Sequence, residues 1–273
     1  MPPELTVESH HFEAMGTSCS LFAVGLSSTQ LLQGEFWVRV LGTRVTRFSD
    51  RSELAQLNRS EGKWMDVSAE IELLLREALR AHELSAGLVN AAVLPSMIAI
   101  GYTRSLADGT SMAALENAHP APVLPEVLTV RSGGARLARG CGLDLGGLAK
   151  GWMADHLALQ LGSNVLANLG GDLRAAGLGP DGDGWPVGFG GTTVMLRDQG
   201  AATSSVRRRR WGDLHHLIDP RTGLPSDSGL EEVSVVAATA CDAEIVAKTA
   251  LLLGPGLATA YCAAHAHAWW FSP

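Results

Sequence analysis

Apolar residues recur at helical spacing along several stretches of the chain. Residues 29–48 and 69–88 both predict amphipathic helices, and the pattern is clearest in the second stretch. Further helices are expected from about residue 242 to 253 and after Pro255. Ser52 followed by Glu53 has the form of an N-cap and a first turn, which predicts a short helix ending near Asn58. The apolar faces of the two long helices would comprise Leu32, Phe36, Leu41, Val45 and Phe48, and Ile71, Leu74, Leu75, Ala78, Leu79 and His82.

Extended segments occupy much of the remaining chain. Residues 6–25 alternate in part between apolar and polar types, which predicts a strand or a hairpin. Short extended pieces separated by Gly- and Pro-containing turns follow in residues 121–139 and 164–234, and residues 267–272 form a last strand-like segment. Residues 143–161 predict a strand, a Gly-Gly turn and a helix. Strand clusters separated by helices predict an α+β fold, a single domain in which helices flank a mostly antiparallel sheet.

Composition narrows the class of protein. The chain has 273 residues, is 46% apolar and 18% charged, and carries a formal net charge of −7, so it can bury a large core and is not a disordered protein. The acidic balance argues against a nucleic-acid partner. The one basic run, Arg207–Arg210, is interpreted as a solvated strand or loop rather than as a phosphate-binding segment. Only three of the 21 basic residues are lysines, namely Lys63, Lys150 and Lys248.

Cysteine usage and the N-terminal segment indicate the compartment. The four cysteines form no C-x-x-C pair and lie far apart, so free and mostly buried thiols are expected rather than a metal or disulfide framework. The first twelve residues show no basic and apolar leader, and no uninterrupted apolar stretch approaches the length of a membrane span. We therefore expect a cytoplasmic protein that is not embedded in a membrane.

Three turn-rich clusters carry candidate chemistry. The segment Asp144–Gly151 places two glycines and Lys150 at the start of a predicted helix, where backbone amides and a positive charge favour a phosphate or diphosphate. The spacing matches neither a Walker loop nor a dinucleotide fingerprint, and a tight connection remains the alternative. The segment Asn168–Leu173 has a second Gly-Gly pair at a strand end, which indicates either close approach to a ligand or a β-bulge.

The third cluster runs from His215 to Pro225. Its Asp-Pro-Arg-Thr-Gly sequence predicts a turn, because Pro fixes φ and Gly accepts a positive φ. His216 lies three residues before Asp219, so an imidazole and a carboxylate come close to one turn. Histidine is the usual general base near neutral pH, although a surface turn with an ordinary histidine gives the same pattern.

Together these motifs resemble the ApbE family, the FAD:protein FMN transferases. The resemblance covers residues 12–271 and leaves residues 1–11 as an N-terminal extension. Seven motifs occur in the order and spacing of the family: MGT (15–17), SEL with Asn58 (52–54, 58), DLGGLAKG (144–151), NLGGDL (168–173), ATS (202–204), HLIDPRTGLP (216–225) and AEIVAKTALLLG (243–254).

The resemblance implies that FMN is transferred from FAD to a Thr hydroxyl of an acceptor protein, with Mg²⁺ on the diphosphate and AMP as the leaving group. It assigns His216 as the base that takes the Thr proton. Met15 and Phe48 would lie near the flavin, and Asn90 would bond its edge. The full set expected to bind FAD is Met15, Phe48, Asn90, Asp144, Lys150, Gly170, Gly171, Asp172, Asp219 and Thr222.

Departures from the family pattern concern the metal above all. The family's Asp and Thr ligands fall on Glu244 and Lys248 here, while Gly147 would still present its carbonyl to the ion. Glu244 supplies hard oxygen, whereas protonated Lys248 is no ligand and would act as a cation substitute. The alternative is an ordinary ion pair between these two residues, which lie four apart on one face of the predicted helix. Asn90 also lies in a segment where the family often has Asp, and Ser205 stands where Gly is usual. Two other functions share the same FAD pocket: a FAD-binding or chaperone-like protein, and a Mg²⁺-dependent FAD pyrophosphatase that releases FMN and AMP.

Overall fold

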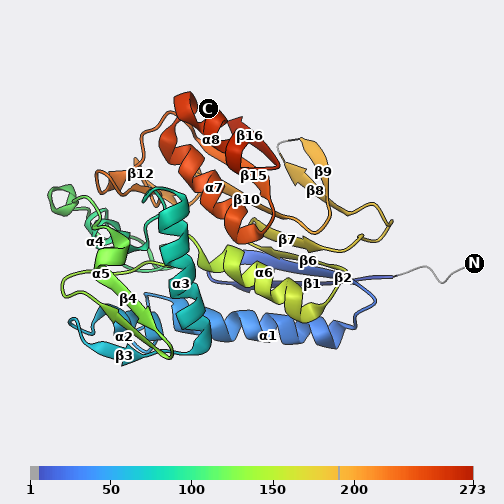
Figure 1. The fold of residues 1–273 in the computed structure, drawn as a ribbon, viewed down its shortest axis with the longest axis horizontal. Coiled ribbons are helices and arrows are strands. Elements are labelled where there is room, and N and C mark those ends of the chain that lie inside the picture. The colour runs from blue at the N-terminus through green and yellow to red at the C-terminus, as the bar shows by residue number, and fades with distance from the viewer. Residues whose placement is uncertain (1–5, 190, 273) are drawn as a thin grey trace, which may run out of the picture.

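A seven-stranded antiparallel sheet forms the centre of the computed structural model, which describes residues 6–189 and 191–272 (Figure 1). Its spatial order is β1-β2-β6-β7-β10-β15-β16, and every neighbouring pair is antiparallel. The predicted α+β class is thereby confirmed. The strands are β1 (Val7–Ala14), β2 (Thr17–Val24), β6 (Val165–Leu169), β7 (Asp172–Ala176), β10 (Gly200–Ser205), β15 (Glu232–Ala237) and β16 (Ala268–Ser272).

Both faces of the sheet are covered, because alternate residues of each strand enter different cores. On β6, Val165, Ala167 and Leu169 pack under the helices, whereas Leu166 joins a cluster with the hairpin on the other face. The helices are α1 (Ser28–Val45), α6 (Ala149–Leu161), α7 (Ala240–Leu253) and α8 (Pro255–His265). The hairpin consists of β8 (Trp185–Phe189) and β9 (Thr192–Leu196).

A smaller layer packs beyond α1 and shares its core with the main sheet. It contains a three-stranded sheet in the order β3-β5-β4, and α3 stands beside it (Figure 1). Its elements are α2 (Glu53–Asn58), β3 (Trp64–Asp66), α3 (Ala69–Leu84), α4 (Leu94–Ala99), α5 (Leu124–Val127), β4 (Leu128–Arg131) and β5 (Gly134–Leu137). Four two-residue strands follow β10: β11 (Arg210–Trp211), β12 (Leu214–His215), β13 (Ile218–Asp219) and β14 (Leu224–Pro225).

The helix predictions are confirmed to within a few residues at each end. The Ser52 hydroxyl caps α2 by accepting a hydrogen bond from the Ala55 amide at 3.0 Å. The expected strand before the first Gly-Gly turn is wrong: residues 141–145 have no regular structure, and the helix begins at Ala149. The Asn58 side chain explains this, because it bonds both backbone groups of Leu143 at 2.7 and 2.9 Å in place of a neighbouring strand.

Two other expectations concern the chain's N-terminal segment and its cysteines. The expected boundary after residue 11 falls inside β1, since residues 7–11 pair with residues 20–24, while residues 1–5 lie outside the described residues. All four cysteines are free. Within the described ranges, no helix is long and apolar enough to cross a membrane.

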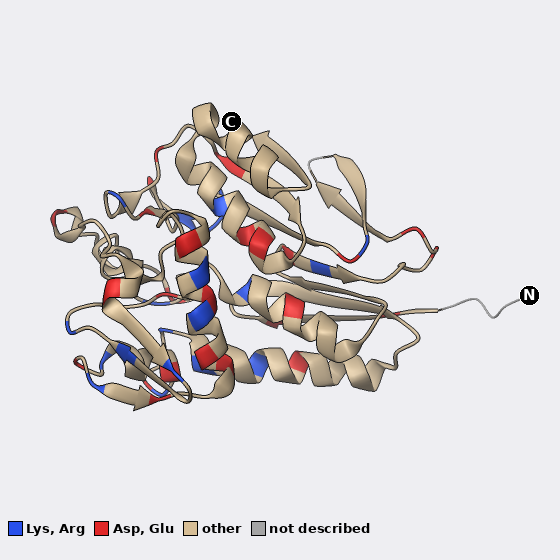
Figure 2. Ribbon diagram, viewed as in Figure 1, with Lys and Arg blue, Asp and Glu red and all other residues tan. Residues whose placement is uncertain are grey.

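Charges of both signs alternate along α3 (Figure 2), where Arg76 pairs with Glu72 at 2.8 Å.

Candidate active site

A cavity of about 690 Å³ opens where the two layers meet. The Asp144–Gly147 turn, the end of α1 and the β6–β7 turn line one side, and the segment after β10 together with α7 lines the other. A buried carboxylate positions α7: Asp155 on α6 accepts hydrogen bonds from the Ala240 and Cys241 amides at 2.9 and 3.0 Å. An anion at a helix N-terminus is stabilising, so the two helices that border the cavity are fixed to one another.

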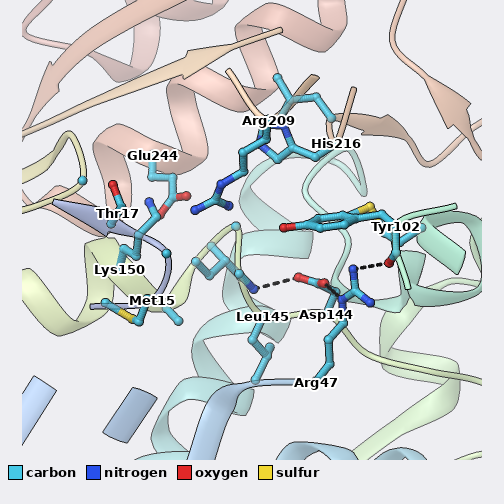
Figure 3. Close-up of a pocket in the computed structure, with 18 of the residues that line it drawn as sticks. Met15, Thr17, Arg47, Tyr102, Asp144, Leu145, Lys150, Arg209, His216 and Glu244 are labelled. Atoms are coloured by element: carbon cyan, nitrogen blue, oxygen red, sulfur yellow. Dashed lines mark hydrogen bonds and ion pairs between the residues drawn. The ribbon is translucent and has the colours of Figure 1, made fainter. Parts of the chain in front are cut away.

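Asp144 anchors the first Gly-Gly turn. One of its oxygens accepts a hydrogen bond from the Gly146 amide at 2.8 Å, and the other pairs with Arg47 Nε at 2.5 Å. Arg47 also donates to the Tyr102 carbonyl at 2.6 Å, and its guanidinium lies 4.3 Å from the Phe48 ring centroid and 4.6 Å from that of Tyr102 (Figure 3). Sequence reasoning missed Arg47 and Tyr102, since neither belongs to a recognisable motif.

Lys150 and Asp172 form a buried ion pair at the back of the cavity. Burial lowers the pKa of Lys150, but the Asp172 and Glu244 carboxylates more than offset this and hold it above its ordinary value. The expected anion beside Lys150 is therefore a carboxylate of the chain itself, which weakens the argument that the lysine demands a phosphate. Gly170 turns β6 into β7 at φ +72°, and Thr17 side-chain atoms would lie 2.5 Å from a Cβ placed there.

Glu244 and Lys248 share a buried face of α7. The Lys248 ammonium donates to the Gly147 carbonyl at 2.6 Å and lies 3.7 Å from a Glu244 oxygen. The second Glu244 oxygen is buried and has no hydrogen-bond partner among the described residues. Burial and the nearby Asp172 charge raise the pKa of Glu244 to about 7, although Lys150 and Lys248 oppose this shift.

This arrangement does not fit a divalent cation. The Gly147 carbonyl, expected to face the ion, already accepts a hydrogen bond from the Lys248 ammonium. Moreover, no group of three or more His, Cys, Asp or Glu side chains that could hold a metal ion occurs in the described part of the chain. The residues at the family's ligand positions thus form an ion pair of their own.

The two neighbouring histidines point to different surroundings. His215 Nε2 lies 3.0 Å from the Ser226 carbonyl oxygen, and the His215 ring does not line the cavity. His216 does line the cavity. Burial, followed by the charges of Arg209 and Lys248, holds the pKa of His216 well below its ordinary value, so the ring is neutral at pH 7. Its Nδ1 is buried and, within residues 6–189 and 191–272, has no hydrogen-bond partner.

The arginine run is not the fully solvated loop expected from the sequence. Arg207, Arg208 and Arg210 are exposed and Arg209 is half-buried, but Arg208 and Arg209 both line the cavity. Arg209 is half-buried and adopts φ +50°, a conformation that is strained for a side chain with a Cβ. Its guanidinium extends toward Glu244, and the Tyr102 hydroxyl points into the same space (Figure 3).

The remaining predicted residues divide into two groups. Met15, Phe48 and Asn90 line the cavity, but the Asn90 amide is engaged elsewhere: it accepts from the Ala92 amide at 2.9 Å and donates to the Pro122 carbonyl at 2.8 Å. The structure does not bring Gly171, Asp219 and Thr222 to the cavity wall.

The Asp-Pro-Arg-Thr-Gly turn closes on itself. Asp219 is held by Arg221 at 2.6 Å, and the Thr222 hydroxyl donates to the Asp219 carbonyl at 3.4 Å. The predicted turn is thus present, but its polar side chains stabilise the turn and do not reach into the cavity.

An α+β fold with a cavity lined by two glycine-rich turns and five cationic side chains suits a nucleotide-sized anion. A sequence model of the ApbE family matches residues 15–270, so the chain belongs to that family. Similar relatives are the FAD:protein FMN transferases of Klebsiella pneumoniae (strain 342), 30% identical over 87% of this chain and 83% of the relative, and of Vibrio cholerae, 26% identical over 88% and 79%.

Solved structures share the fold. The apo flavinyl transferase ApbE of Pseudomonas stutzeri superimposes with a TM-score of 0.84 and 20% identity, covering 98% of this chain and 93% of its own. The flavin transferase ApbE from Vibrio cholerae gives a TM-score of 0.78 and 21% identity, with 98% of both chains covered. The family resemblance read from the seven motifs is confirmed.

Proposed function

We propose that this protein transfers FMN from FAD to a Thr hydroxyl of an acceptor protein. The Thr oxygen attacks the FMN-side phosphorus, the new P–O ester bond forms, and the bond to the bridging oxygen breaks, so that AMP leaves with that oxygen. Membership of the ApbE family supports this assignment. The observation that carries it within the cavity is a neutral histidine, His216, facing the same space as the cations Lys150, Lys248 and Arg209.

His216 is proposed as the base that takes the Thr proton. A base must be neutral before it accepts a proton, and the lowered pKa of His216 satisfies this requirement at pH 7. The same lowering makes the free imidazole a weak base. A diphosphate placed beside it would raise its pKa, because an anion favours the protonated ring. Basicity would then increase when FAD binds.

Positioning is assigned to the turns and to the pairs that fix them. Phosphoryl transfer depends mainly on alignment and on stabilisation of developing charge. The amides of the Asp144–Gly147 turn, held by Arg47, and the ammonium of Lys150, held by Asp172, are fixed before any ligand arrives. We place the diphosphate over this turn and the flavin near Met15 and Phe48.

A single incubation separates the three candidate functions. The protein is mixed with FAD and a purified Thr-containing FMN acceptor domain, with its Thr→Ala variant as the control. In-gel flavin fluorescence and AMP release are measured with Mg²⁺ and with EDTA. Label on the acceptor but not on its variant supports the transferase. AMP without label indicates the pyrophosphatase, and FAD binding without either product indicates a binder.

The cytoplasmic location stays a prediction.

A further inference from the structure

The ammonium of Lys248 occupies an unusual position in the cavity wall. Its side chain is 15% exposed, and its hydrogen bond of 2.6 Å goes to the neutral carbonyl of Gly147 rather than to a carboxylate. The nearest Glu244 oxygen lies 3.7 Å away, beyond hydrogen-bond distance. An ammonium has three donors, and a carbonyl satisfies one of them. The cation therefore keeps hydrogen-bonding capacity directed at whatever fills the cavity.

Charge in the cavity wall is not balanced by the chain. Five cationic side chains line it against three carboxyl groups, which leaves an excess of two positive charges when all three carboxyl groups are ionised. The cations are Arg47, Lys150, Arg208, Arg209 and Lys248, and the carboxylates are Asp144, Asp172 and Glu244. The diphosphate of FAD, a diester, carries two negative charges at neutral pH, so the ligand and the wall match in charge.

The excess lies on one side of the cavity. Arg47 pairs with Asp144, and Lys150 pairs with Asp172, so those cations are neutralised within the protein. On the α7 side, among the described residues, Arg209 forms no hydrogen bond or ion pair, although its side chain extends into the cavity and its backbone adopts φ +50°. A half-buried cation without a partner is costly unless an anion binds there. Among the described residues Arg208 forms no such contact either, although it is exposed, and the ion pair of Lys248 with Glu244 is long at 3.7 Å. Arg208, Arg209 and Lys248 are therefore the groups left for a ligand.

We propose that Arg209 and Lys248 together supply the charge that a divalent cation would otherwise bring to the diphosphate, so that this protein needs no metal. The hydrogen bond from Lys248 to the Gly147 carbonyl holds the ammonium in place. The inference rests on the proposed transfer of FMN. As the bond to the bridging oxygen breaks, negative charge grows on the departing AMP phosphate. The Lys248 ammonium stabilises that charge by donating a hydrogen bond, without itself gaining or losing a proton.

The test compares wild type, Lys248→Met and Lys248→Thr, with Lys63→Met as the control for removing an exposed lysine that does not line the cavity. Each protein is stripped with EDTA and exchanged into metal-free buffer. FAD affinity is measured by flavin fluorescence titration, and transfer is measured on the acceptor domain, both in EDTA and in excess Mg²⁺. Circular dichroism melting checks that each variant is folded, and only folded variants are compared.

We expect wild type and Lys63→Met to bind FAD equally well in EDTA and in Mg²⁺, and to transfer at rates within about twofold under the two conditions. Loss of one charge-stabilising donor should lower the transfer rate of Lys248→Met by about 10²–10³-fold in EDTA. The FAD affinity of Lys248→Met should also fall, by about tenfold or more. Lys248→Thr, which has a hydroxyl but no charge, should regain part of the transfer rate and part of the FAD affinity when Mg²⁺ is added.

The failure of this inference differs from the failure of the proposed function. Wild type that loses transfer in EDTA and recovers it with Mg²⁺ overturns metal independence while leaving the transferase intact. If no acceptor is labelled under either condition, the proposed function fails. The FAD affinities of wild type and Lys248→Met, with and without Mg²⁺, then decide whether Lys248 binds FAD in place of a metal ion. Tighter binding of FAD by wild type in Mg²⁺, or unchanged binding by Lys248→Met, would refute the role given to Lys248.

Discussion

Replacing Lys150 by Met should destabilise the fold. The Lys150 side chain is 11% exposed and that of Asp172 is 4% exposed, so the substitution leaves a buried carboxylate without its cation. Breaking a buried pair in this way costs about 3–5 kcal/mol. At about 2.1 cal/mol/K per residue of unfolding entropy, this corresponds to a fall of roughly 5–9 °C in Tm for 273 residues.

Urea unfolding and thermal melting measure the loss. Lys150→Met with Asp172→Asn should recover at least about 2 kcal/mol, because neither charge is then buried alone. Lys63→Met, at an exposed position, should stay within about 0.5 kcal/mol of wild type. FAD titration of the folded variant should show affinity weaker by about 1–3 kcal/mol. A single variant as stable as the wild type would refute the buried pair, and unchanged affinity would remove Lys150 from the FAD site.

His216→Ala should slow transfer by about 10²–10⁴-fold, whereas His215→Ala should leave the transfer rate close to that of wild type. Equal transfer rates for the two variants would show that His216 is not the base. Because the pKa of His216 is lowered in the free protein and a bound diphosphate raises it, the acid limb of kcat should lie at higher pH than that of kcat/KM for FAD, and the reverse order would contradict this electrostatic argument. The stability that neutral His216 contributes is present above about pH 6.5, its unfolded pKa, and is lost as pH falls toward its folded pKa. Gly170→Ala should cost at least about 1–2 kcal/mol in urea unfolding, because a φ of +72° accounts for that much and the overlap with Thr17 adds to it, while Gly146→Ala, at ordinary φ and 3.1 Å from an Asp144 oxygen, should cost less.

The sequence predicted the helices well because their signals are local. The apolar stripe of α3 and the Ser52 cap of α2 depend on residues within a turn or two of each other. The order of the sheet has no such signal. β2 pairs with β6 from a distant part of the chain, and only the packed core decides that pairing. The false strand before Gly146 has the same origin, because the distant Asn58 side chain takes the backbone bonds that a strand would need.

Site residues were predictable where a motif carried them into the cavity, as with Asp144, Lys150 and His216. Motif membership alone did not ensure a place there. Asp219 and Thr222 belong to a strong turn motif, yet the turn uses its own polar groups internally. Arg209 shows the opposite case, because a run of four arginines is normally solvated, yet this one lines the cavity, with its backbone at φ +50°.

The two lysines of the cavity therefore have different physical tasks, although both sit beside a carboxylate. The charge of Lys150 is matched by Asp172 in the absence of any ligand, so it fixes a turn and contributes to the free energy of folding. The Lys248 ammonium donates a hydrogen bond of 2.6 Å to the Gly147 carbonyl, and the neighbouring Glu244 carboxyl has a pKa of about 7. Much of the lysine's charge therefore remains available to a bound anion. A preorganised cation of this kind stabilises developing charge without reorganising during the reaction. Removing Lys150 should consequently be seen first in stability, and removing Lys248 first in FAD binding and transfer.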